Sequence, residues 1–117
     1  MINKVRINYG DLFLVDFDPS VGHEFQGQRP ALVIESDQQI NKTNLVTVLP
    51  LTSNLNNKTA DDILIKVDDS NKLHLDSVVK VYNIISFDHS RFINKIGRVN
   101  DNVQADVKKY LKKHFGL

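Results

Sequence analysis

The stretch GDLFLVDFDPSVGHEFQGQRPALVI, residues 10–34, decides the fold, because it holds two apolar runs separated by a polar loop. The first run, residues 11–17, is rich in aliphatic and aromatic side chains and is bounded by a glycine and an Asp-Pro pair, which is typical of a strand. The second run, residues 30–36, begins with a proline, whose missing N–H does least harm at the start of a strand. We therefore predict two strands joined by a loop with charged residues.

Further short apolar runs follow, and turns rich in Asn, Ser and Asp separate them. We predict strands over residues 45–51, 63–67, 78–82 and 93–99. Pro50 lies near the end of the first of these runs, which indicates an edge, a bulge or the exit of the strand.

The C-terminal stretch NDNVQADVKKYLKKHFGL changes to a helical period. Its apolar residues recur on one side and its lysines on the other: Val103, Val107, Tyr110, Leu111 and Phe115. Asp101 followed by Gln104 resembles a capping box, and Gly116 is a plausible stop. Several strands followed by one helix predict a mainly β fold, a small antiparallel barrel or curled sheet with the helix over an open side.

Composition limits the class of protein. The chain has 117 residues, which fits one domain over residues 1–117, and no cysteine, so disulfides and thiolate metal sites are excluded. No apolar run approaches the roughly 20 residues that cross a bilayer, and the N-terminus has no signal-peptide core, so we expect a soluble protein. The net charge of +1 does not by itself indicate a nucleic-acid binder. The four histidines show no metal-ligand spacing, so we expect neither metal nor cofactor.

The polar loop is the first candidate for chemistry. Gly22 and Gly27 permit backbone conformations closed to other residues and could bracket a tight excursion. Arg29 presents a planar, permanently charged fork that suits phosphate oxygens, although a structural ion pair with Glu24 is the alternative. His23 suits proton transfer near neutral pH, but a lone loop histidine is also common as an exposed polar residue. Glu24 could accept a proton or be a surface charge.

Two further polar groups follow predicted strands. Thr52 and Ser53 come directly after the Pro50-Leu51 end of a strand, where their hydroxyls could bind a phosphate or only start a turn. No nucleophile elbow and no phosphate-binding P-loop is present. The other group is Lys80, Tyr82, Asn83 and Ser86. On an extended chain Lys80 and Tyr82 share one face, and an exposed strand edge is the alternative.

Taken together, these motifs resemble the MazF/PemK (Kid) toxins of bacterial type II toxin–antitoxin systems. Residues 10–34 are similar to the family's N-terminal signature, through Gly10-Asp11, Asp18-Pro19, Gly22-x-Glu24, Gly27 and Arg29-Pro30. VTVLPLTS, residues 46–53, resembles the second signature, and DSVVKVYNIISFD the following strand segment. Gly-His-Glu in place of Gly-Ser-Glu favours the PemK/Kid branch.

The resemblance implies an SH3-like, CcdB/PemK-like β-barrel with a C-terminal helix, acting as a cytoplasmic homodimer. It implies a ribosome-independent, metal-independent endoribonuclease that cuts single-stranded mRNA at short motifs, leaving 2′,3′-cyclic phosphate and 5′-hydroxyl ends. It also implies a MazE/PemI-like antitoxin whose disordered tail covers the RNA groove and through which the complex reaches operator DNA. No membrane partner is expected.

The same resemblance assigns roles to residues. Arg29 would stabilise the charged transition state, since its pKa of roughly 12 or higher makes it a poor base. Thr52 would hold a phosphate oxygen, and His23 and Glu24 would support proton transfer. The RNA-binding residues would be Ser53, Gln28, Phe25, Lys80, Tyr82 and Asn83, with Phe25 as a stacking residue or, alternatively, a core or interface residue.

The chain departs from the family pattern in one segment. Where PemK/Kid proteins carry Arg-x-Asp-Gln, it has Lys80-Val81-Tyr82-Asn83, and the basic residue that follows becomes Ile85. Tyr82 thus replaces the aspartate proposed as base, which leaves His23 or Glu24 for that role. Two alternatives remain: an RNA-binding relative that has lost activity, and a CcdB-like gyrase poison, against which the Arg29-Pro30 and Thr52-Ser53 motifs argue.

Overall fold

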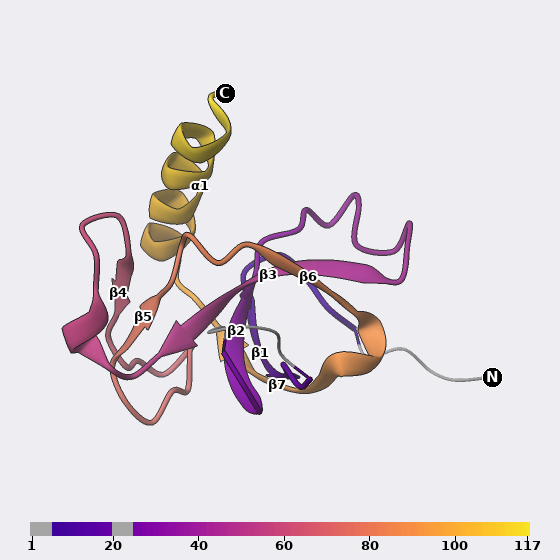
Figure 1. The fold of residues 1–117 in the computed structure, drawn as a ribbon, viewed down its shortest axis with the longest axis horizontal. Helices are drawn as coiled ribbons and strands as arrows, with labels where there is room; N and C mark the ends of the chain where they lie inside the picture. The colour runs from indigo at the N-terminus through magenta and orange to yellow at the C-terminus, as the bar shows by residue number, and fades with distance from the viewer. Residues whose placement is uncertain (1–5, 20–24) are drawn as a thin grey trace.

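The computed structural model describes residues 6–19 and 25–117 (Figure 1). In chain order the elements are β1 Asp11–Asp16, β2 Gln28–Val33, β3 Leu45–Thr52, the 3-10 helix η1 Leu55–Asn57, β4 Ile63–Ile65, β5 Ser77–Val79, β6 Ile85–Asp88, the 3-10 helix η2 His89–Arg91, β7 Phe92–Arg98 and α1 Asp101–Phe115. Each strand predicted from the sequence has a counterpart, although β4 and β5 end at Ile65 and Val79, before the predicted ends at residues 67 and 82, and β6 is an additional strand.

The strands form one antiparallel sheet in the order β4-β5-β3-β2-β1-β7, with β6 also paired to β3. The long strand β3 carries β6 beside its first half and β5 beside its last two residues, as Figure 1 shows. Within the described residues β4 and β7 do not pair, so the sheet curls without closing. The predicted mainly β, antiparallel fold is confirmed, in the form of an open curl.

The β1–β2 hairpin positions Arg29. The N–H of Phe17 donates to the carbonyl of Gly27 (2.9 Å), and the N–H of Gly27 donates to the Asp18 carboxylate (2.9 Å). Gly27 has φ of +68°, a conformation that favours glycine, so the predicted need for a glycine here is met. Strand β2 begins two residues before the predicted start, and Arg29 pairs with Val15 inside it.

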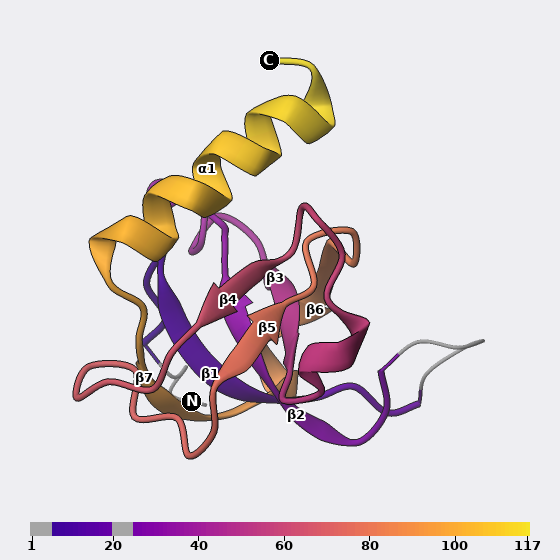
Figure 2. The same cartoon turned by 90° about the vertical axis from the view of Figure 1, so that its left-hand side faces the viewer.

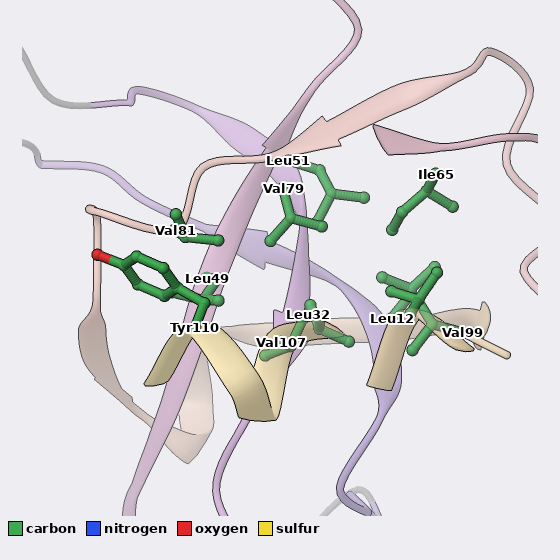
Figure 3. Close-up of a cluster of buried hydrophobic side chains, with 11 residues drawn as sticks. Leu12, Leu32, Leu49, Leu51, Ile65, Val79, Val81, Val99, Val107 and Tyr110 are labelled. Carbon is green, nitrogen blue, oxygen red and sulfur yellow. The ribbon is translucent and has the colours of Figure 1, made fainter. Parts of the chain in front are cut away.

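Helix α1 covers one face of the curled sheet. The helix lies across the sheet in Figure 2, and Figure 3 shows Val107 and Tyr110 beside the sheet residues Leu32 and Leu49. Val103 belongs to the same buried cluster. A second cluster of buried side chains lies on the other face and includes Phe13, Phe17, Val33 and Val48. The predicted apolar stripe is thus confirmed for three buried residues and for Leu111, which is partly buried against the same cluster, whereas Phe115 is exposed.

The helix ends differ in how well they were predicted. The N-cap is Asn100, whose side chain accepts a hydrogen bond from the N–H of Val103 (2.9 Å), so the expected cap at Asp101 is wrong by one residue. Gly116 ends the helix in a left-handed conformation, as predicted. Among the described residues no helix has the length and apolar character needed to cross a bilayer.

The predicted strand over residues 78–82 is corrected. Strand β5 ends at Val79, and a turn follows in which the N–H of Asn83 donates to the carbonyl of Lys80 (3.2 Å). The chain then enters β6, which pairs with β3. Lys80 and Tyr82 therefore do not share one face of a strand.

Candidate active site

The register of β2 and β3 brings together two of the predicted catalytic residues. Ala31 pairs with Pro50 at the end of the β2–β3 ladder, and Arg29 and Thr52 each lie two residues beyond this pair. Both residues therefore lie at adjoining ends of two neighbouring antiparallel strands. They also line one pocket, so the sequence motifs that carry them form a single site.

Arg29 is half-buried and lines the pocket with a guanidinium that contacts a backbone carbonyl and an aromatic ring. Its Nε–H donates to the carbonyl of Gln26 (2.9 Å), and its guanidinium lies over the ring of Phe25, 5.0 Å from the centroid. Within residues 6–19 and 25–117 it forms no ion pair with a carboxylate. Since arginine has five N–H donors in a fork, several can face an oxyanion. His23 and Glu24, including the alternative Glu24–Arg29 pair, lie outside the described residues.

Thr52 and Ser53 contribute hydroxyls next to this arginine. Thr52 is half-buried, and its Oγ1 accepts a hydrogen bond from the N–H of Asn54 (3.1 Å), which fixes the direction of its side chain. A hydroxyl that accepts one hydrogen bond still carries a hydrogen that it can donate. Ser53 is exposed. The turn role and the phosphate-binding role that the sequence left open for Thr52 are therefore compatible.

A pocket of about 610 Å³, called here the large pocket, opens at this place. The ends of β2 and β3 contribute Gln28, Arg29, Thr52 and Ser53, and the loop between β4 and β5 contributes Lys72 and His74. Lys72 and His74 are not among the site residues predicted from the sequence. Nothing local marks them, because only the return of this loop onto β7, where the Arg98 N–H donates to the Ser70 carbonyl (3.0 Å), places them there. The described residues contain no group of three His, Asp or Glu side chains arranged to hold a metal ion.

A second pocket of about 330 Å³, called here the small pocket, holds three of the predicted RNA-binding residues: Phe25, Tyr82 and Asn83. Phe17 and Pro50 also line it, so its walls are largely aromatic and apolar. Phe25 packs edge-on against Phe17, with ring centroids 6.4 Å apart, and carries Arg29 above it. Arg29 thus links the two pockets: it lines the large one and contacts a wall of the small one.

Lys80 lies apart from this arrangement. Its ammonium donates to the Asp62 carboxylate (2.6 Å) and to the carbonyl of Asn57 (2.7 Å), and its side chain is 14% exposed. Burial alone would raise the pKa of Asp62, but hydrogen bonds from Lys80 and from the N–H groups of Thr59 and Val81 outweigh it and hold this pKa below its usual value. The ion pair therefore fastens the turn after β5 to the loop before β4.

Tyr82 is fastened to the helix. Its hydroxyl donates to the Asp61 carboxylate (2.6 Å), which also accepts from the ammonium of Lys113 (3.0 Å), and its ring packs edge-on against Tyr110. The hydrogen bond to Asp61 raises the pKa of Tyr82, and the Tyr82 hydroxyl, followed by Lys113, lowers the pKa of Asp61. A phenol in this state remains protonated at neutral pH and is a poor general base.

Comparison with known proteins places the chain in a family. Residues 8–115 match the family described as PemK-like, MazF-like toxin of type II toxin–antitoxin system. The endoribonuclease MazF9 of Mycobacterium tuberculosis is 32% identical over 114 residues, which cover 92% of this chain and 95% of that protein. The endoribonuclease toxin ChpB of Escherichia coli is 35% identical over 110 residues, which cover 92% of each.

Solved structures agree with these relatives. The crystal structure of MazF from Deinococcus radiodurans superposes with a TM-score of 0.81 at 27% identity, covering 95% of this chain and 97% of that one. A MazE–MazF crystal structure from the same organism (form II) gives 0.72 at 25% identity, covering 95% and 96%. The closer assignment to the PemK/Kid branch stays a prediction. With its sequence match, its fold and the Arg29–Thr52 pair, the chain belongs to the PemK-like, MazF-like toxins of type II toxin–antitoxin systems and is an endoribonuclease.

Proposed function

We propose that this toxin cleaves single-stranded mRNA, without a metal ion and without the ribosome, at a phosphate held between Arg29 and Thr52. The observation that carries the proposal is the state of Arg29. Its guanidinium lies at the edge of two pockets and, among the described residues, meets a carbonyl and an aromatic ring but no carboxylate. A half-buried guanidinium whose forked donors lie at the edge of a pocket favours an anionic ligand.

The proposed reaction uses the substrate's own nucleophile. The ribose 2′-oxygen loses its proton to a general base and forms a bond to the neighbouring phosphorus. The bond from phosphorus to the 5′-oxygen then breaks, and a general acid protonates that oxygen. The products are a 2′,3′-cyclic phosphate and a 5′-hydroxyl, so no water and no cofactor are consumed in this step.

Each residue near Arg29 and Thr52 takes a role that its chemistry allows. Arg29 stabilises the charge that develops on the phosphorane oxygens, because forked donors aimed at developing charge lower the barrier. Thr52 donates its hydroxyl to a phosphate oxygen. Since the Tyr82 hydroxyl is bonded to Asp61, we assign the base and the acid to His23 and Glu24.

The remaining predicted residues would hold the nucleotides beside the cleaved bond. Phe25, Tyr82 and Asn83 line the small pocket, where an aromatic wall suits base stacking. Gln28 and Ser53 are exposed at the large pocket and can donate to bases or phosphates. The predicted contact of Lys80 with RNA requires its ammonium to leave Asp62.

We further propose that the toxin works in the cytoplasm as a homodimer and is neutralised by a MazE/PemI-like antitoxin with a disordered tail. The MazE–MazF structure from Deinococcus radiodurans supports such a partnership. A disordered tail that folds on binding can cover an extended groove, and blocking the RNA site would be sufficient for inhibition. Operator DNA would be reached through the antitoxin.

The deciding experiment is incubation of the purified protein with a defined single-stranded RNA in the presence of a chelator, followed by mapping of both ends. We expect cleavage at a short motif with cyclic phosphate and 5′-hydroxyl ends. Uncut RNA with retained affinity would identify an RNA-binding relative instead. Intact RNA together with altered DNA topology would point to a gyrase poison.

A further inference from the structure

The large pocket differs in charge from the rest of the chain. The sequence holds 14 acidic and 15 basic residues, yet the described residues that line this pocket include Arg29, Lys72 and His74 and no carboxylate. Amide and hydroxyl groups complete its polar lining, through Gln28 and Asn94 among others. Such a pocket in a nearly neutral chain favours an anionic ligand.

The loop between β4 and β5 that carries Lys72 and His74 is fixed by a buried side chain. Asn71 is 0% exposed, and its amide donates to the carbonyl of Lys66 (2.8 Å) while its Oδ1 accepts from the N–H of Leu73 (3.0 Å). The loop packs so tightly on β7 that a Cβ at Gly97 would lie 2.4 Å from the carbonyl oxygen of Asn71. The pocket wall is therefore preorganised.

Lys72 itself has an unusual backbone conformation. Its φ is +55°, the single positive value among the described residues other than glycine. A lysine in this region costs about 1 kcal/mol or more relative to glycine, and such strain is found at functional sites. Both Lys72 and His74 are exposed, so their side chains are accessible from solvent at the pocket.

The apolar part of the pocket lining suits the base of a nucleotide. Leu14, Pro30, Leu51 and Ile96 lie with the polar groups around a volume of about 610 Å³, within the range of roughly 300–1,000 Å³ typical of small-molecule pockets. An apolar surface for a base, with cations and amides around it, is the arrangement that a single nucleotide requires.

We infer that the large pocket binds the nucleotide on one side of the cleaved phosphate, with its base against the apolar lining and the His74 ring and its outer phosphate at Lys72. The inference rests on the proposed function and extends it to two residues outside the predicted site. The small pocket, on the other side of Arg29, is left for the opposite neighbour. RNA would then pass over Arg29 and Thr52 with one nucleotide in each pocket.

The test is a titration of the toxin with a short single-stranded RNA that carries a 2′-deoxy nucleotide at the mapped cleavage position, over a range of salt concentrations. Lys72→Gly removes the charge and relieves the backbone strain, so the variant should fold. We expect about two- to fivefold weaker binding. The slope of log affinity against log salt should fall in magnitude by about 0.7, the value for one phosphate contact on a single strand. Lys72→Arg should restore both.

His74 is tested in the same titration. His74→Ala should weaken binding about tenfold through lost stacking, and His74→Phe should retain most of the affinity. Cleavage assays use the unmodified RNA, which keeps its 2′-hydroxyl at the cleavage position. Both variants should raise KM and leave kcat unchanged, as expected for residues that only bind. Lys66→Ala is the matched control, because Lys66 is exposed on the same hairpin and does not line the pocket.

The outcomes separate the two proposals. Cleavage by the wild type, with unchanged affinity and salt slope in Lys72→Gly and His74→Ala, would overturn the subsite and leave the function intact. If the wild type cuts no RNA, the proposed function fails, and the same titration with the unmodified RNA, which then stays intact, still shows whether Lys72 and His74 bind it. Variants that bind RNA normally but are no longer inhibited by an acidic antitoxin peptide would identify the pocket as a peptide-binding site, which also overturns the inference.

Discussion

Two cations that the family resemblance assigns to one RNA groove, Arg29 and Lys80, are held in opposite ways. Lys80 is 14% exposed and donates to a fully buried carboxylate at 2.6 Å, with a backbone carbonyl as its second partner. Arg29 is half-buried at the edge of the large pocket, and no carboxylate among the described residues pairs with it. The ammonium of Lys80 is thus paired within the fold, whereas the described contacts of the Arg29 guanidinium are a backbone carbonyl and an aromatic ring.

This difference shows that residue type and motif position do not separate a structural charge from a functional one. The interaction partner of each charged side chain separates the two. A buried ion pair whose remaining donors and acceptors are also hydrogen-bonded stabilises a connection between segments, and its members have little left for substrate. A guanidinium that stacks on an aromatic ring at the edge of a pocket presents a fork of donors that suits an oxyanion.

The largest expected effect comes from breaking the structural pair. Asp62→Asn keeps the shape of the side chain but leaves the ammonium of Lys80 buried without a counter-charge. We expect a loss of about 3–5 kcal/mol in the free energy of unfolding, the usual cost of removing one partner of a buried pair. Urea denaturation followed by fluorescence or circular dichroism measures it.

Two controls make this result specific. Asp69→Asn removes an exposed carboxylate of the β4–β5 loop and should change the unfolding free energy by less than about 0.5 kcal/mol. Asp62→Asn combined with Lys80→Met removes the stranded charge and should recover part of the loss. Wild-type stability of Asp62→Asn would show that the pair does not support the fold, and Lys80 would then become a free RNA contact.

The next effect concerns activity. Arg29→Gln keeps hydrogen-bonding capacity but removes the charge and the fork, so we expect kcat for RNA cleavage to fall about 10²- to 10³-fold. Stability should change by only about 1 kcal/mol, because the fold loses one hydrogen bond and one cation–π contact. Arg6→Gln, at an exposed position, is the control. Cleavage at the wild-type rate would remove Arg29 from the mechanism.

The sequence predicted those features that depend on local pattern. The two strands around the polar loop, the buried stripe of the helix and the stop at Gly116 follow from alternation, helical spacing and glycine's conformational range. The N-cap was missed by one position because Asn100 and Asp101 are both good capping residues, and the choice depends on backbone geometry.

The other differences come from contacts between distant segments. The turn at Lys80 is stabilised by Asp62, which precedes it by a whole hairpin, and no spacing rule connects the two residues. In the same way, Lys72 and His74 reach the large pocket because Asn71 packs on Gly97 of β7. The residues at the ends of β2 and β3 were candidates from residue type and position, but each also had an ordinary structural explanation, and only the resemblance to a family gave them specific roles.

The smallest expected effect concerns Tyr82, which shares features of both Lys80 and Arg29. It is 54% exposed and lines the small pocket, yet its hydroxyl is hydrogen-bonded to Asp61. Tyr82→Phe keeps the ring and removes the O–H that stabilises the charged form of Asp61. The pKa of Asp61, held low first by this hydroxyl and then by Lys113, should rise toward its usual value. Carboxyl titration by NMR measures the shift.

The pH dependence follows from the sign of that shift. A carboxyl whose pKa is lowered by folding contributes stability above its unfolded value of about 3.9 and loses that contribution as the pH falls through the folded value. The unfolding free energies of wild type and Tyr82→Phe should therefore differ slightly at neutral pH and converge in acid. Cleavage should persist, because a phenol with a raised pKa is not the base. A large loss of kcat with an intact fold would instead place the Tyr82 hydroxyl in the proton transfer. His23 and Glu24 would then lose that role.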